Sequence, residues 1–201
     1  TFAEYMRNKT VFGGMMGKLF LTSELWDGID TYDYYTREDF AVKNTVPTAE
    51  GALEIAMREY AGTINGSNCL VAGYGRIGKV LAWMLRGIGA KVTVSARRTS
   101  DLAWVELFGY QAVKTDDICD RDQYDLIFNT IPALVFNRRM LSKAREGTIL
   151  IDLASAPGGV DYEAAEKLGI RVIKALSLPG RVAPKAAGEI IKNTIYNIME
   201  E

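Results

Sequence analysis

The sequence predicts an α/β fold with a doubly wound parallel sheet. Strand-like apolar runs alternate with helix-like segments through residues 67–180, a glycine-rich turn follows the first of these strands, and 48% of the 201 residues are hydrophobic, enough to bury a core. Six strands are expected, at residues 68–72, 91–95, 110–113, 126–129, 148–153 and 171–174. Helices are expected between them, near residues 76–86, 101–108, 138–144 and 162–167.

The flanking segments divide the chain into four parts. Residues 1–46 carry only short apolar stretches that cannot close a core, so we interpret them as the remnant of an amino-terminal domain. Residues 47–66 are expected to form an inter-domain helix and linker, with Thr48 capping the first turn. Residues 67–180 form the predicted sheet domain, and residues 181–201 are expected to form a carboxy-terminal helix with an apolar stripe.

Composition argues against several classes of function. The 24 Lys and Arg residues against 25 Asp and Glu residues give a net charge of -1, without an electrostatic signature for nucleic acid or an anionic membrane. The sequence has no run of about eighteen apolar residues and no secretory signal, which favours a cytoplasmic protein. The absence of His removes every mechanism that needs an imidazole. Two cysteines without a CxxC spacing predict reduced structural thiols and no metal site.

The strongest motif is Gly73-Tyr74-Gly75-Arg76-Ile77-Gly78, which stands between an apolar strand and a helical segment. This context is typical of the dinucleotide fingerprint of a Rossmann domain. Gly73 would make the tight turn, Gly75 would let the backbone approach a pyrophosphate, and Gly78 would allow close packing of helix on strand. The pyrophosphate would rest on the helix amino terminus, where free amides and the helix dipole favour anions. The alternative is a glycine-rich turn without a ligand.

The end of the next strand favours NADP over NAD. An NAD-binding domain usually places a carboxylate here, on the ribose hydroxyls. The sequence instead has Ser95, Arg97 and Arg98, and guanidinium groups bind phosphate oxygens bidentately, which suits the 2′-phosphate of NADP. The alternative is that both arginines are simply solvated at the start of a helix.

Two further strand ends should line the same edge, since ligands of doubly wound folds bind at the carboxyl ends of the strands. Asn129-Thr130-Ile131-Pro132 is expected to line the ribose or nicotinamide channel. Asp152, Leu153 and Ser155 follow the fifth strand and are expected to border the nicotinamide face. For Asp152 and Ser155 taken singly, an ordinary strand-ending turn is an equally good interpretation.

Taken together, these motifs resemble those of the A subunit of dipicolinate synthase. The resemblance extends over residues 45–201 and is also carried by Thr48-Ala49-Glu50-Gly51-Ala52, Pro157-Gly158-Gly159, Leu178-Pro179-Gly180-Arg181-Val182-Ala183-Pro184-Lys185 and Ala187-Gly188. It implies an NADP-dependent oxidation of dihydrodipicolinate to dipicolinate during sporulation, in the mother-cell cytoplasm and beside a flavoprotein-like B subunit. It also implies an amino-terminal domain that this chain mostly lacks.

The implied reaction sets the roles expected of the remaining candidates. Removal of a hydride and a proton from a dihydropyridine yields an aromatic ring, so the protein mainly has to position the ring and the cofactor. The small dicarboxylate substrate needs cationic partners, for which Lys185 and Arg181 are candidates. Asp152 or Ser155 would accept or relay the proton. A solvated lysine in the first turn of a helix is the alternative for Lys185.

Two other functions are compatible with the sequence. One is a Rossmann reductase of another substrate class, similar to shikimate or alanine dehydrogenase, since the fold alone does not choose a substrate. The other is an NADP-binding subunit or scaffold without catalysis of its own, whose partner carries the active site. The sequence also leaves a homo-oligomer open.

Overall fold

The computed structural model describes residues 1–120 and 124–201, without the side chains of residues 119 and 120. The chain forms two compact units. The larger unit is Thr45–Val182, and the smaller one combines Thr1–Asn44 with Ala183–Glu201.

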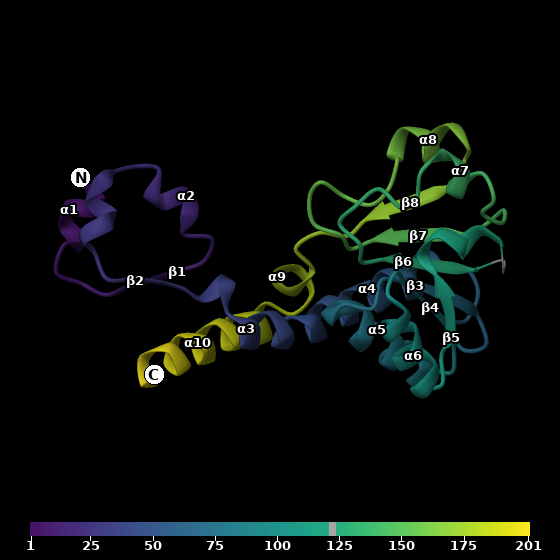
Figure 1. Cartoon of the computed structure of the whole chain (residues 1–201), viewed down its shortest axis with the longest axis horizontal. Helices are drawn as coiled ribbons and strands as arrows, with labels where there is room; N and C mark the ends of the chain where they lie inside the picture. Colours follow the sequence, from purple (N-terminus) through teal and green to yellow (C-terminus); the bar gives the residue numbers. More distant parts are fainter. Residues whose placement is uncertain (121–123) are drawn as a thin grey trace. The chain divides into compact units, whose positions relative to one another are not determined.

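The larger unit is built on a six-stranded sheet in which every neighbouring pair is parallel. The strand order β5-β4-β3-β6-β7-β8 places β3, the first strand of this sheet, at its middle (Figure 1). This confirms the predicted doubly wound parallel sheet. The strands are β3 (Asn68–Ala72), β4 (Lys91–Ala96), β5 (Gln111–Lys114), β6 (Leu126–Asn129), β7 (Ile149–Asp152) and β8 (Arg171–Lys174).

Helices cover both faces of the sheet because its central strand is apolar on both sides. Cys69 and Val71 of β3 point into one core, whereas Leu70 and Ala72 point into the other, as the two-residue period of a strand requires. The first core is completed by helices α4 (Thr45–Glu59), α5 (Arg76–Gly87), α6 (Thr99–Leu107) and α9 (Leu178–Val182). The second is completed by η3 (Thr115–Asp120), α7 (Arg138–Leu141) and α8 (Tyr162–Lys167).

Helix α4 begins earlier than the sequence predicts. The helix starts at Thr45, so Thr48 lies within its first turn, and the prediction that Thr48 is the capping residue is wrong. Pro47 is tolerated because the amides of a first helical turn have no partner inside the helix. Gly51 then lets α9 approach closely, since a Cβ there would lie 3.0 Å from the Cβ of Leu178.

The smaller unit contains a two-stranded parallel sheet and a small apolar core. Trp26, Ala3 and Ile29 form that core. The last helix, α10 (Pro184–Glu200), is held to the first segment through a hydrogen bond from Asn197 to Asp39 and a bidentate pair between Arg37 and the terminal Glu201. The other elements are α1 (Phe2–Met6), β1 (Val11–Gly13), α2 (Gly17–Phe20), η1 (Glu24–Gly28), β2 (Thr31–Asp33), η2 (Tyr34–Thr36) and α3 (Glu38–Lys43).

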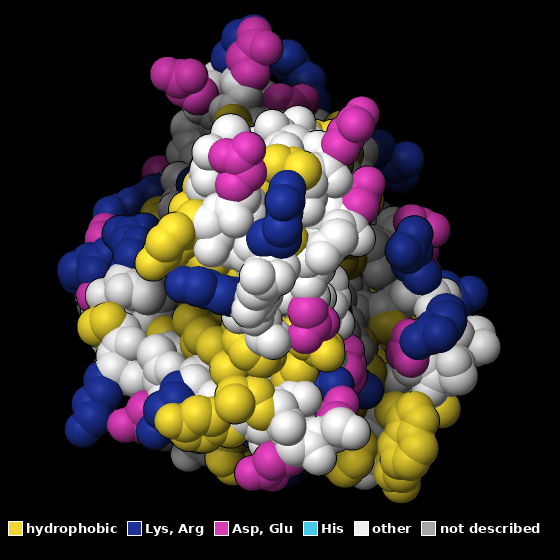
Figure 2. Space-filling view, turned by 90° about the vertical axis from the view of Figure 1, so that its left-hand side faces the viewer, with side chains coloured by type: hydrophobic (Ala, Val, Ile, Leu, Met, Phe, Trp, Pro, Cys, Tyr) yellow, Lys and Arg dark blue, Asp and Glu magenta, His cyan; other side chains and the backbone are white. Residues whose placement is uncertain are grey.

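The surface carries mixed charge. Positive and negative side chains are interspersed on the face of the molecule shown in Figure 2. No helix in the described part of the chain has both the length and the apolar character that crossing a membrane requires.

Candidate cofactor-binding site

The strand ends that carry the predicted site residues are aligned across the sheet. Ala72 at the end of β3 is the register partner of Ser95 on one side and of Asn129 on the other. Asn129 is in turn paired with Asp152, and Asp152 with Lys174. These residues form one row through five strands. The loops that follow this row form the carboxyl edge of the sheet, where doubly wound folds bind ligands.

The glycine motif makes a tight turn between β3 and α5. Gly73 has a φ of 101°, a left-handed conformation that favours glycine, and a Cβ there would lie 2.5 Å from Oγ1 of Thr130. A Cβ on Gly78 would overlap the carbonyl oxygen of Gly73. Gly78 therefore allows α5 to start directly against the end of β3, and Gly73 allows the loop after β6 to approach the turn.

Gly75 leaves open space at the start of α5. It occupies the N-cap position, where no side chain makes a capping bond, and a Cβ built on it would meet no atom within 4 Å. Tyr74 and Ile77 pack against the core, whereas Arg76 is exposed. The first amides of a helix lack intrahelical acceptors and lie at the positive end of its dipole. The turn thus offers the kind of cradle that a pyrophosphate requires.

The two arginines after β4 differ in their surroundings. Arg98 forms a bidentate pair with Asp101, with Nε–Oδ2 and Nη2–Oδ1 distances of 2.8 and 3.0 Å, and this hydrogen bonding raises the pKa of Arg98. Arg97 is exposed and forms no ion pair with any residue that the structure describes. Ser95 is fully buried, and its hydroxyl has no hydrogen-bond partner within the described ranges. Of the three predicted residues, Arg97 is therefore the one with a free charged group at this strand end.

The loop after β6 folds back over the end of β3. Both the backbone amide and the hydroxyl of Thr130 donate hydrogen bonds to the carbonyl oxygen of Ala72, at 2.9 and 2.8 Å. Ile131 is half-buried and Pro132 is exposed. This loop and the glycine turn thus lie side by side at the carboxyl edge, as the sequence predicts for two segments of one site.

Asp152 is a buried carboxylate that is 1% exposed and bound by three neutral donors. The side-chain amide of Asn129 donates to Oδ1 at 2.8 Å, the backbone amide of Ala154 donates to the same oxygen at 3.2 Å, and the hydroxyl of Tyr162 donates to Oδ2 at 2.6 Å. Leu153 is buried in the core, whereas Ser155 is exposed. Sequence reasoning missed Tyr162, although its place at the start of the helix after this loop was visible in the pattern.

The two cationic candidates belong to different compact units. Arg181 is exposed on α9 of the larger unit. Lys185 is the second residue of α10 and belongs to the smaller unit. Within the described residues, no group of three or more Cys, Asp or Glu side chains could hold a metal ion.

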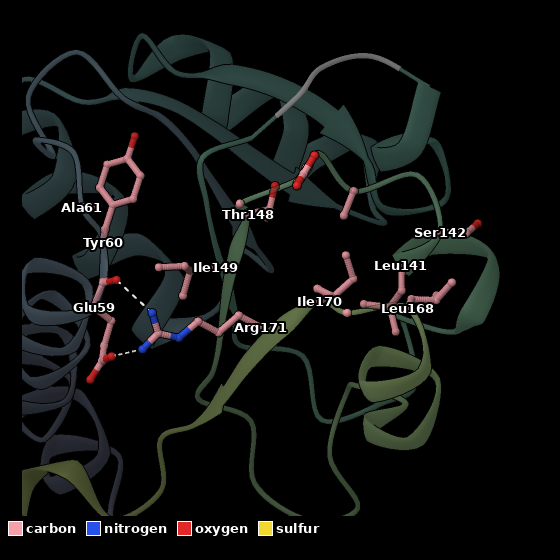
Figure 3. A pocket seen from close by; sticks show the side chains of 14 residues that line it. Glu59, Tyr60, Ala61, Leu141, Ser142, Thr148, Ile149, Leu168, Ile170 and Arg171 are labelled. Atoms are coloured by element: carbon pink, nitrogen blue, oxygen red, sulfur yellow. Dashed lines mark hydrogen bonds and ion pairs between the residues drawn. The ribbon is translucent and has the colours of Figure 1, made fainter.

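A cavity of about 440 Å³ lies at the opposite, amino edge of the sheet (Figure 3). It opens beside the first residues of β7 and β8, where the guanidinium of Arg171 binds both the carboxylate and the carbonyl oxygen of Glu59. None of the predicted site residues lines it. The cavity is lined by Glu59, Tyr60, Ala61, Leu141, Ser142, Ala144, Glu146, Gly147, Thr148, Ile149, Leu168, Gly169, Ile170 and Arg171.

Comparison with known proteins gives consistent matches. Residues 41–166 match the family model described as D-isomer specific 2-hydroxyacid dehydrogenase, NAD binding domain. The A subunit of dipicolinate synthase from Bacillus subtilis (strain 168) is 39% identical over 168 residues, which are 83% of this chain and 57% of that protein. The chain therefore spans less than two thirds of the length of this curated relative.

Two crystal structures agree with this match. That of the dipicolinate synthase A chain from Bacillus subtilis has a TM-score of 0.89 and 32% identity, covering 98% of this chain and 68% of that one. That of the A subunit of dipicolinate synthase from Bacillus halodurans has a TM-score of 0.88 and 34% identity, covering 97% of this chain and 67% of that one.

Proposed function

Since the chain belongs to the family of the dipicolinate synthase A subunit and carries the NAD-binding domain of a dehydrogenase, we propose that it oxidises dihydrodipicolinate to dipicolinate with NADP during sporulation. The observation that carries this proposal is the turn from Gly73 to Gly78. It joins an open helix amino terminus to a strand end at the edge where such folds bind ligands.

The residues present fit a nicotinamide dinucleotide. The open space beside Gly75 would hold the pyrophosphate against the amides of α5, and the loop of residues 129–132 would line the ribose and nicotinamide. The bound cofactor would supply a hydride acceptor. We assign the 2′-phosphate of NADP to Arg97, because its guanidinium is exposed and has no carboxylate partner among the described residues, whereas Arg98 is engaged by Asp101.

The predicted catalytic residues receive different roles in this proposal. Asp152 has both carboxylate oxygens occupied and is buried, which supports a positioning role. Ser155 is exposed at the carboxyl edge and is our candidate for relaying the proton that leaves the ring. Lys185 and Arg181 are exposed cations, and we propose each of them as a candidate for binding a substrate carboxylate.

Two partners complete the proposal. The word "subunit" in the name of the relative supports a second polypeptide, which we propose to be a flavoprotein-like B subunit in the mother-cell cytoplasm. A homo-oligomer of this chain is a further proposal. The proposed cofactor site needs neither partner, because the glycine turn, Arg97 and the 129–132 loop all belong to the larger unit of this chain.

An NADP-binding protein without catalysis of its own is the second candidate. It is favoured by one observation, namely that the predicted proton acceptor Asp152 is buried with both carboxylate oxygens already hydrogen-bonded. The two candidates are separated by assaying hydride transfer in the presence and absence of the partner polypeptide. Cofactor binding without transfer in either condition would favour the non-catalytic function.

The experiment that tests the proposed function is a titration of the purified chain with NADPH and NADH, followed by nicotinamide fluorescence. Gly75→Val is expected to abolish binding while the chain stays folded, because its side chain would enter open space and a valine in place of the N-cap glycine costs only about 1 kcal/mol. Gly87→Val is the matched control, since it lies at the other end of α5 and also meets no atom within 4 Å. Failure of the wild-type chain to bind either nucleotide would overturn the proposal.

A further inference from the structure

The buried carboxylate of Asp152 connects two loops that are separate in the sequence. Through its Oδ1 it accepts hydrogen bonds from Asn129, at the end of β6, and from Ala154, in the loop after β7. Asn129 is fully buried, so its side-chain amide has no access to water. The orientation of that amide is therefore set by its protein partners.

The fixed orientation of the Asn129 amide in turn holds the loop of residues 129–132 in place. Its Oδ1 accepts a hydrogen bond from the amide of Ile131 at 3.1 Å, and its Nδ2 donates to the carbonyl oxygen of the same residue at 3.2 Å. Rotation of the Asn129 amide would break both bonds. The conformation of this loop therefore depends on the hydrogen bond between Asn129 and Asp152.

The second loop packs tightly against the same amide. A Cβ on Gly159 would overlap Nδ2 of Asn129 and lie 2.5 Å from the carbonyl oxygen of Ile131. The carbonyl oxygen of Gly159 also accepts hydrogen bonds from the amides of Val135 and Phe136, at 3.1 and 2.9 Å. The two loops thus form one packed layer, with the Asp152 carboxylate beneath it.

Tyr162 supplies the remaining bond to this carboxylate. It is the first residue of α8, which is capped by Asp161, and its hydroxyl donates to Oδ2 at 2.6 Å. Burial, reinforced by the Asp152 carboxylate, raises the pKa of Tyr162, so the hydroxyl remains a proton donor throughout the physiological range. Lys174, the register partner of Asp152, lies over the ring, with its Nζ 5.6 Å from the ring centroid.

We propose that Tyr162 is a positioning residue, which holds Asp152 and through it the two loops that face the nicotinamide half of the cofactor. This inference rests on the proposed function for the identity of the ligand, but the positioning itself concerns only residues of this chain. Tyr162 does not touch the glycine turn or Arg97 in any described contact. Loss of the Tyr162 hydroxyl should therefore weaken binding of the nicotinamide half of the dinucleotide and leave binding of the adenosine half unchanged.

The first test measures amide hydrogen exchange in the chain without nucleotide. Tyr162→Phe is expected to speed exchange at the amides of Ile131 and Ala154 by about tenfold, with no change in the amides of β3, because one hydrogen bond to a buried charge is lost. Tyr60→Phe is the matched control. Tyr60 lines the cavity at the opposite edge, where burial and the neighbouring Asp125 raise the pKa of its hydroxyl. Unchanged exchange in Tyr162→Phe, or equal acceleration throughout the sheet, would overturn the inference.

The second test compares NADPH with 2′,5′-ADP, which lacks the nicotinamide half. For Tyr162→Phe we expect the Kd for NADPH to rise by about tenfold while that for 2′,5′-ADP stays within about twofold. The double variant Tyr162→Phe with Asp152→Asn should bind NADPH no more weakly than Asp152→Asn alone, because Tyr162 acts through Asp152. Equal losses for both nucleotides, or additive losses in the double variant, would contradict this.

The two tests distinguish failure of the inference from failure of the proposed function. If the wild-type chain bound neither nucleotide, the proposed function would be wrong. Hydrogen exchange would still decide whether Tyr162 positions the two loops. If the wild type bound NADPH and the Tyr162→Phe variant bound it equally well, the inference alone would be wrong.

Discussion

The carbonyl oxygen of Gly73 occupies the space that a Cβ on Gly78 would need. The oxygen belongs to the turn after β3 and the glycine to the first turn of α5, so the contact fixes how closely the helix approaches the strand. Backbone atoms cannot rotate away as a side chain can. Any residue other than glycine at position 78 must therefore move the turn, the helix, or both.

Gly78→Ala is expected to destabilise the chain by about 1–3 kcal/mol, because one added methyl group forces a shift of packed backbone. Gly87→Ala in the same helix meets no atom within 4 Å and should instead be neutral or stabilise by up to about 1 kcal/mol, through helix propensity. Urea denaturation of the two variants measures both effects. Equal free energies of unfolding in the two variants would refute the assigned close approach.

The unequal surroundings of the two arginines predict unequal effects on cofactor choice. Arg97→Ala is expected to weaken NADPH binding by about 10-fold or more and to leave NADH binding nearly unchanged, because a charge-assisted contact to the 2′-phosphate is lost. Arg98→Ala should have the smaller effect, since that guanidinium is already paired with Asp101. Fluorescence titration with both nucleotides checks this. A larger loss of NADPH binding in Arg98→Ala would reverse the assignment.

The buried thiol of Cys69 predicts a dependence of stability on alkaline pH. Burial raises the pKa of Cys69 from 9.0 to about 11, so the folded state disfavours the thiolate that the unfolded state forms. The contribution of the protonated thiol is fully present below pH 9 and is lost as the pH rises to 11, to a total of about 3 kcal/mol.

Comparison with Cys69→Ala isolates this contribution, because other groups titrate in the same range. The difference in free energy of unfolding between wild type and variant should shrink between pH 9 and 11. A difference that stays constant over that range would show that the thiol does not titrate as proposed.

The strands of the sheet were well predicted because a short run of sequence is enough to recognise most of them. The inner strands β3, β6 and β7 are short, largely apolar runs, and β3, β6 and β8 have the bounds expected from the sequence. The two-residue alternation that separates the cores on either face could not be recognised, because both faces of a central parallel strand are buried and the run is apolar throughout. The start of α4 was misplaced because Pro47 was interpreted as preceding the helix, whereas it is the third residue of the first turn.

The glycine positions of the candidate site could be predicted from the sequence, but the side-chain contacts around it could not. Gly73 and Gly78 stand out because no other residue fits their contacts. The sequence gives no sign that Asp152 is buried, that Arg98 is held by Asp101, or that Tyr162 reaches a carboxylate from the next helix. The contacts of Asp152 arise only when segments distant in the sequence meet, whereas the Arg98–Asp101 pair forms within the first turn of α6.

The order of strands in the sheet has a consequence for synthesis on the ribosome. The strand β3 lies in the interior of the sheet, paired with β4 on one side and β6 on the other. Residues 68–114 can form the half-sheet β3-β4-β5 as soon as they emerge, but the second edge of β3 stays uncovered until residues 126–129 follow. An open strand edge with unpaired backbone groups pairs readily with other chains. The nascent protein is therefore most vulnerable to aggregation in the interval between these two segments, and a pause in translation there would prolong that exposure.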